Sequence, residues 1–128
     1  MNIRITAIRK ADYRDLQARF ENPIEHACDV QEGQTWISVD GAQPEGMCDS
    51  AWESMRWFVQ ELAAGRGNFY DGWMKNPHSA MISCNDGFRP VSFYIELEVS
   101  SQQLSLIRGQ RDISHTPDCQ SMTNGNIM

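Results

Sequence analysis

The stretch SAMISCNDGFRPVSFYIELE, residues 79–98, decides the fold. Residues 91–98 alternate apolar and polar side chains and residues 79–84 form a short apolar run, so both segments are predicted to be strands. Residues 85–87 (NDG) between them have the chemistry of a turn, and residues 88–90 (FRP) widen the connection. The stretch therefore predicts a β-hairpin.

The strongest helical pattern lies upstream of this hairpin, over residues 49–64. Apolar side chains recur there at the spacing of one helix face, at Trp52, Met55, Val59 and Leu62. Ser50 and Glu53 have the spacing of a capping box at the start of the helix. Gly65 is placed to end it in a left-handed conformation.

The N-terminal part of the chain predicts two further strands and a second helix. Residues 2–9 alternate like a half-buried strand, and residues 34–39 form another short strand. Residues 11–21 predict a short helix with Asp12 as its cap. The order β-α-β-α-β-β predicts an α+β fold, with a single domain and a small, mostly antiparallel sheet that helices cover on one face.

The composition changes at residue 100, where the chain becomes polar and weakly patterned. We expect a compact α+β domain over residues 1–100, followed by a C-terminal tail over residues 101–128 that is extended or docked. The apolar residues that would dock the tail, or join two copies into a homo-oligomer, are Leu104, Leu106 and Ile107.

The charge and hydropathy of the chain exclude two classes of partner. Seventeen acidic and eleven basic side chains give a net charge of −6, whereas a nucleic-acid binder needs a basic surface. No stretch approaches the ~20 apolar residues of a membrane-spanning helix. The N-terminus lacks the regions of a signal peptide, so a cytoplasmic location is expected, in which thiols stay reduced.

Four cysteines are the first candidates for chemistry: Cys28, Cys48, Cys84 and Cys119. None forms a C-x-x-C pair, so any site that they share must be assembled by tertiary folding. Cys48 lies just before the helix over residues 49–64, where the positive end of the helix dipole favours a thiolate and Asp49 opposes it. The structural alternative is a small hydrophobe buried under the first turn.

Two further groups flank the other cysteines. Cys84 precedes Asp86, which suits a turn, and Arg89, whose guanidinium suits a carboxylate or phosphate ligand. Asp86 and Arg89 are close enough in sequence to pair with each other, or one of them would face a ligand. Cys28 lies in an unpatterned loop two positions after His26, and a nearby imidazole can activate a thiol or join it as a metal ligand.

Aromatic side chains supply candidate walls for a ligand site. Residues 65–78 form a long loop that contains Phe69, Tyr70 and Trp73, which would act as a lid or as one wall of a pocket. The alternative is a hydrophobic flap over an incomplete core. Trp52 belongs to the apolar stripe of the predicted helix and is a core residue by default. Tyr70, Trp73, Trp52 and Arg89 together are the predicted substrate-binding residues.

Two cysteine-containing segments also match a set of spaced motifs. Residues 44–52 (PEGMCDSAW) fit P-x-G-x-C-x-x-A-W, and residues 84–91 (CNDGFRPV) fit C-x-D-G-x-R-P-V. With the lone Cys28 before a glycine-containing strand, this set resembles a family of small microbial proteins whose activity is uncharacterised. The resemblance covers residues 2–98 and departs at Asn85, where the family often has threonine.

This resemblance implies a grouping of residues rather than an activity. It places Cys28, Cys48 and Cys84 with Asp86 and Arg89 in one motif set and leaves Cys119 outside it. It therefore implies that the three cysteines share a site.

The leading functional hypothesis is a cysteine-lined small-molecule site in an enzyme. Cys48 or Cys84 would be the nucleophile or the acid/base group. Arg89 would anchor an anionic substrate, and Asp86 would orient it. Asp86 is therefore counted with the two cysteines as a catalytic candidate.

Two alternatives remain open. One is a zinc or iron–sulfur site with Cys28, Cys48 and Cys84 as ligands and His26 as a candidate fourth. The other is a non-catalytic interaction or structural module whose cysteines belong to the core.

Overall fold

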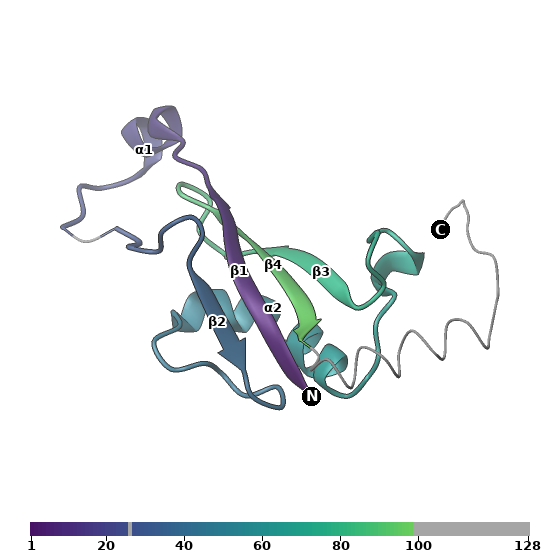
Figure 1. Cartoon of the computed structure of the whole chain (residues 1–128). Helices are drawn as coiled ribbons and strands as arrows, with labels where there is room; N and C mark the ends of the chain where they lie inside the picture. Colours follow the sequence, from purple (N-terminus) through teal and green to yellow (C-terminus); the bar gives the residue numbers. More distant parts are fainter. Residues whose placement is uncertain (26, 99–128) are drawn as a thin grey trace, which may run out of the picture.

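The computed structural model describes residues 1–25 and 27–98 of the chain (Figure 1). In chain order the elements are β1 (Asn2–Lys10), α1 (Arg14–Phe20), β2 (Thr35–Ser38), α2 (Asp49–Ala63), the single 3₁₀ turn η1 (Phe69–Asp71), β3 (Ser79–Ser83) and β4 (Val91–Glu98). His26, Cys119 and the predicted tail over residues 101–128 lie outside the described residues. The prediction of a small α+β domain with an antiparallel sheet is confirmed.

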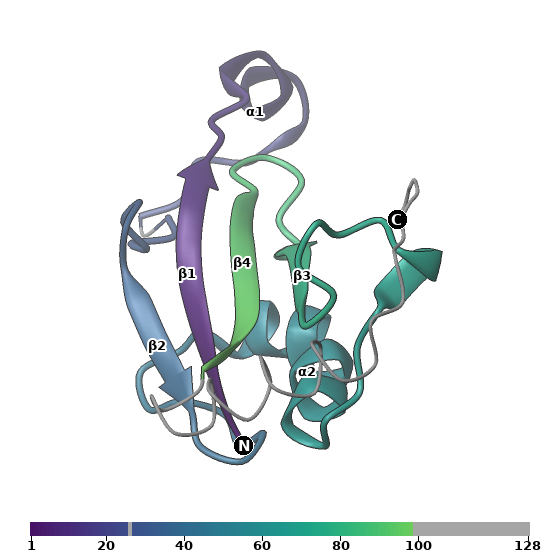
Figure 2. The ribbon, with the colours of Figure 1, turned by 45° about the vertical axis from the view of Figure 1, so that its right-hand side comes forward.

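The four strands form one antiparallel sheet in the order β2-β1-β4-β3 (Figure 2). The predicted hairpin is the pair β3–β4, in which Ile82 lies opposite Phe93. The central strand β1 pairs with β2 and β4, so Ile5 has Trp36 on one side and Ile95 on the other. Alternation along β1 and β4 therefore directs one set of apolar side chains to a single sheet face.

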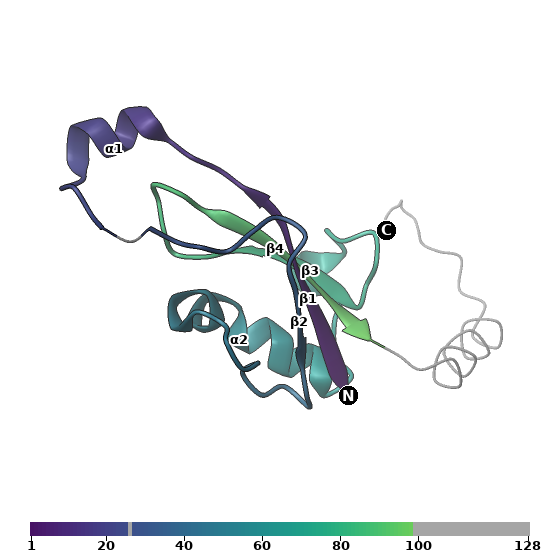
Figure 3. The same ribbon diagram turned by 60° about the vertical axis from the view of Figure 1, so that its left-hand side comes forward.

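The helix α2 packs on that face and closes the hydrophobic core (Figure 3). Met55, Val59 and Leu62 on the helix are fully buried. They share one hydrophobic cluster with strand residues, among them Ile3, Ile5, Ala80, Val91, Phe93 and Ile95. The apolar stripe of α2 and the apolar face of the sheet thus form one interface. Its burial is the main source of stability for such a two-layer domain.

The helix α1 does not cover the sheet. Of the two helices predicted to cover one face of the sheet, only α2 does so. It projects beyond the end of the sheet (Figure 3), it buries none of its residues, and Phe20 is 66% exposed. It also begins at Arg14, because the N–H groups of Ala11 and Tyr13 donate to the carbonyls of Pro90 and Phe88 and keep that segment extended.

Neither of the two predicted N-terminal caps is found in the structure. Asp12 does not cap α1, since its carboxylate accepts hydrogen bonds from the side chains of Arg14 and Gln17 instead. The N-cap of α2 is Cys48 rather than Ser50, so the predicted capping box is wrong.

Neither helix in the described part of the chain has the length and apolar character needed to cross a bilayer.

The C-terminal end of α2 follows the sequence. Gly65 has a φ of 89° and its N–H donates to the carbonyl of Leu62 at 3.0 Å. The N–H of Arg66 donates to the carbonyl of Glu61 at 2.9 Å. This pair of bonds around a left-handed glycine is the Schellman motif, and the predicted helix stop is confirmed.

Candidate functional site

One cavity of about 280 Å³ brings the three cysteines of the described chain together. Five of its lining residues carry sulfur or polar groups: Cys28, Cys48, Cys84, Ser50 and Asp86. The other five are apolar: Ala27, Val30, Ala51, Val91 and Phe93. These residues come from the loop before β2, the start of α2, the β3–β4 connection and β4. We call this space the cysteine cavity.

Cys84 is fixed at the neck of the β3–β4 connection. Its N–H donates to the carbonyl of Val91 at 3.1 Å, and the N–H of Val91 donates to the Cys84 Sγ atom at 3.3 Å. The sulfur is therefore oriented by the backbone as well as by packing against the core.

Cys48 occupies the N-cap position of α2, and its side chain is exposed. The unsatisfied N–H groups of the first helical turn and the positive end of the helix lie beside it. The neighbouring carboxylate of Asp49 is held by Gln43, whose Nε2 atom donates to Asp49 Oδ1 at 2.9 Å. Because Cys48 is exposed, the alternative of a hydrophobe buried under the first turn is wrong.

Cys28 is half-buried and is held at the cavity by Lys10, the last residue of β1. The Lys10 ammonium donates to the carbonyl of Cys28 at 2.6 Å and to that of Val30 at 3.2 Å. One side chain thus ties this loop to the sheet. His26, the predicted partner of Cys28, lies outside the described residues.

Asp86 combines a turn role with a place on the cavity wall. Its Oδ1 atom accepts the N–H groups of Phe88 at 2.8 Å and Arg89 at 3.2 Å, as its predicted turn chemistry requires. Asp86 and Arg89 therefore pair through the backbone of the arginine rather than through its guanidinium. The carboxylate also lines the cysteine cavity.

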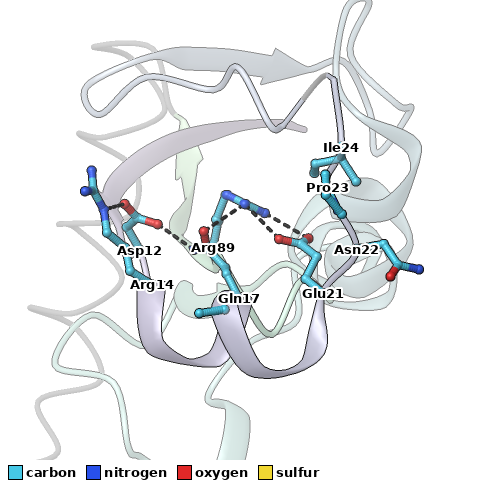
Figure 4. A pocket seen from close by; sticks show the side chains of 9 residues that line it. Asp12, Arg14, Gln17, Glu21, Asn22, Pro23, Ile24 and Arg89 are labelled. Carbon is cyan, nitrogen blue, oxygen red and sulfur yellow. Dashed lines mark hydrogen bonds and ion pairs between the residues drawn. The ribbon is translucent and has the colours of Figure 1, made fainter.

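The Arg89 guanidinium faces α1 instead of the cysteine cavity (Figure 4). Its two terminal nitrogens donate to the two carboxylate oxygens of Glu21 at 3.1 and 2.9 Å, and one of them also donates to Gln17 at 2.9 Å. Both members of the ion pair are largely buried, at 16% exposure each. The hydrogen bonds to Glu21 raise the pKa of Arg89 above its usual value. The expected anchor for a substrate beside the cysteines is thus already engaged elsewhere.

The three aromatic candidates also lie away from the cysteine cavity. Trp52 is buried in the core, as its place on the helix stripe predicts. Tyr70 lines a different cavity. The ring of Trp73 packs against the ring of Tyr70, tilted by 35° and with the two ring centroids 4.9 Å apart. Trp73 is 78% exposed, so it does not form a flap over the core.

The metal alternative requires several ligand side chains close together. Among residues 1–25 and 27–98, no group of three or more His, Cys, Asp or Glu side chains is placed to hold a metal ion. The zinc or iron–sulfur site on Cys28, Cys48 and Cys84 therefore stays a prediction.

Sequence reasoning missed several wall residues of the cysteine cavity, among them Ser50, Val91 and Phe93. A signal for the last two exists, because both point to the apolar side of β4 in the hairpin that carries Cys84. Ser50 lies within the PEGMCDSAW motif. The partners of Arg89, by contrast, have no local signal.

Comparisons of the chain with protein families, with curated proteins and with solved structures find no match. The resemblance to the family of small microbial proteins therefore stays a prediction. The function has to be argued from the geometry of the site.

Proposed function

We propose that this protein binds a small, largely apolar electrophile in the cysteine cavity and that Cys48 attacks it as a nucleophile. The observation that carries the proposal is the convergence of Cys28, Cys48, Cys84 and Asp86 on one cavity. In the reaction, the Cys48 thiol loses its proton to solvent, and the sulfur electron pair forms a bond to one carbon of an activated C=C double bond in the ligand. The π bond breaks, its electron pair moves to the neighbouring carbon, and that carbon takes up a proton from solvent.

The shape and lining of the cavity support a small ligand. Binding pockets for small molecules usually have ~300–1,000 Å³ and apolar walls with a few polar groups. At about 280 Å³, with five apolar lining residues beside Asp86 and Ser50, the cysteine cavity is just below that range and suits a small ligand. Asp86 is the charged group on the wall that would orient a polar atom of the ligand.

The positions of the sulfurs support Cys48 as the nucleophile. It is the exposed cysteine of the three and the one at a helix N-terminus, where negative charge on sulfur is favoured. Cys84 is half-buried, and its sulfur already accepts the N–H of Val91. Cys84 is therefore suited to line the site beside the reacting sulfur.

Competitive alkylation tests this assignment. In a Cys119→Ser background, we expect N-ethylmaleimide to modify Cys48 first, about two- to fivefold faster than a cysteine in an unstructured peptide, because a helix N-terminus stabilises a negative charge by ~0.3–1 kcal/mol. The first adduct should then slow alkylation of the other two thiols, because they share one small cavity. Intact mass and peptide mapping over time measure both effects.

Two control variants separate the proposal from its alternatives. Cys48→Ser should abolish the fast phase, whereas Cys28→Ser should preserve it. Three independent adducts with equal rates would contradict a shared site. Stoichiometric zinc or iron in the purified protein would favour the metal alternative instead.

A further inference from the structure

A second cavity, of about 360 Å³, lies between the outer surface of α2 and the loop over residues 65–78. Four aromatic rings and two carboxylates line it: Trp57, Phe58, Phe69, Tyr70, Glu61 and Asp71. It has no wall residue in common with the cysteine cavity. We call it the aromatic cavity.

The four rings form a continuous cluster around this space. Phe58 is central, with centroid distances of 5.0 Å to Trp57, 5.1 Å to Phe69 and 5.9 Å to Tyr70. Phe69 is buried, whereas Trp57 and Tyr70 are 60% and 54% exposed. Large rings gain free energy from burial, so two half-exposed rings on a cavity wall are typical of a binding surface.

The loop that carries Tyr70 and Asp71 is closed at its base. The N–H of Asn68 donates to the carbonyl of Pro77 at 2.7 Å. Asn68, Tyr70 and Asp71 each have a φ of 55°, in the left-handed region. That conformation is uncommon for a residue as large as tyrosine and costs free energy. Tyr70 is therefore held in a strained conformation beside the cavity, an arrangement that is typical of functional sites.

The charge of the aromatic cavity is negative. The Arg66 side chain donates to both carboxylate oxygens of Glu61 at 2.8 Å, and these hydrogen bonds lower the pKa of Glu61 below its usual value. In the described part of the chain, no hydrogen bond or ion pair engages the exposed carboxylate of Asp71. With Glu61 neutralised by Arg66, Asp71 leaves one uncompensated negative charge at the cavity.

We propose that the aromatic cavity binds a small organic cation of the alkylated or quaternary ammonium class. Ring faces attract a cation within ~6 Å of their centroids, and tryptophan does so most strongly. The alkyl groups of such a cation would contact Trp57 and Tyr70, and Asp71 would balance its charge. This site is separate from the thiol chemistry proposed above and does not depend on it.

The probe is choline, and its matched control is 3,3-dimethylbutan-1-ol, which has the same shape without the charge. The full chain has four tryptophans, and their indole signals would be followed by NMR together with the backbone amides. We expect choline to shift the Trp57 indole signal saturably and to leave the signals of Trp36 and Trp52 in place. The neutral analogue should bind at least about fivefold more weakly, because a cation–π contact contributes ~1 kcal/mol or more.

Three variants test the charge argument. Asp71→Asn should weaken choline binding about two- to fivefold, as expected for an exposed charge pair, and asparagine tolerates the left-handed conformation. Asp15→Asn is the matched control on α1: it changes the net charge equally and should have no effect. Arg66→Met should strengthen binding by a similar factor, because it leaves Glu61 uncompensated.

Several outcomes would overturn the proposal. Equal binding of choline and 3,3-dimethylbutan-1-ol would show a general apolar groove. The absence of a saturable shift at Trp57 up to about 20 mM choline, well above the ~1 mM dissociation constant that corresponds to ~4 kcal/mol, would show that there is no site. Equal effects of Asp71→Asn and Asp15→Asn would show that Asp71 does not contact the cation. Unchanged melting curves confirm that the variants fold.

Discussion

Arg89 is the residue whose role differs most between sequence and structure. Because α1 buries no residue of its own, the Arg89 hydrogen bonds to Glu21 and Gln17 are its main side-chain attachment, beside the backbone bonds of Ala11 and Tyr13. We predict that Arg89→Lys will accelerate amide hydrogen exchange over residues 14–20, since the compact ammonium lacks the planar fork of nitrogens that holds both Glu21 oxygens and the Gln17 side chain. The melting temperature should stay within about 4 °C, because the core lies elsewhere.

The control for this prediction is Arg14→Lys, which alters an exposed arginine whose partner is Asp12. It should leave exchange in α1 unchanged. The same Arg89→Lys protein also tests the sequence-based anchor hypothesis, because a substrate anchor in the cysteine cavity should alter thiol labelling and a residue facing α1 should not. Altered labelling with unaltered exchange would contradict the role of Arg89 in attaching α1.

The partner of Arg89 lay beyond sequence reasoning for a physical reason. Glu21 is 68 positions away, and only the course of the chain after β1 brings it to the β3–β4 connection. Local spacing suggested Asp86 instead, and Asp86 does bind Arg89, but through the backbone N–H. Turn chemistry was predictable because it is local, whereas a guanidinium can reach any carboxylate that the fold brings near.

At the scale of elements, the loop over residues 65–78 depends on Gly67. A Cβ atom there would lie 2.4 Å from the carbonyl oxygen of Pro77, which is backbone and cannot move aside cheaply. We predict that Gly67→Ala opens the base of the loop and destabilises the protein by about 2–3 kcal/mol, as overpacking combined with a lost hydrogen bond does. Urea denaturation measures the change.

Gly87→Ala is the matched control for that substitution. Nothing lies within 4 Å of a Cβ built at Gly87, and its φ is outside the left-handed region. The change should be neutral or slightly stabilising, because alanine restricts the unfolded chain. If Gly67→Ala proved as mild as Gly87→Ala, the close approach of the loop base would not be needed for folding.

The two helices show what periodicity can and cannot predict. The range predicted for α2 was nearly right because its apolar stripe meets the sheet and Gly65 ends it. Tyr13, Leu16 and Phe20 also have helical spacing in and before α1, yet Phe20 stays exposed because no element in the described part of the chain lies opposite it. Amphipathic spacing reports that a helix has an apolar side, whereas the presence of a partner surface is a property of the whole fold.

At the scale of the molecule, the cysteine cavity lies where the two layers of the domain meet at one end. The spacing of the cysteines alone gave no reason to group them, and only the resemblance to a motif set did so. All three line one cavity because α2 starts beside the β3–β4 connection and Lys10 holds the loop of Cys28. Such a site was predictable in composition but not in geometry.

A cavity at that junction leaves room for a ligand but lowers the stability of the protein, because empty space beside a core weakens packing. Ala51, a buried wall residue on α2, allows a direct test. We predict that Ala51→Leu, which keeps a good helix former, fills the cysteine cavity, stabilises the protein by about 0.5–2 kcal/mol and lowers the yield of thiol adducts. Urea denaturation and intact mass measure the two effects.

Ala80→Leu is the matched control for this prediction. Ala80 is equally buried, but it lies in β3 within the core and does not line the cavity. Its enlargement should therefore destabilise the protein by about 1–3 kcal/mol through overpacking. If Ala51→Leu were as harmful as Ala80→Leu, the space beside the cysteines could not admit a ligand, and the proposed chemistry of Cys48 would lose its site.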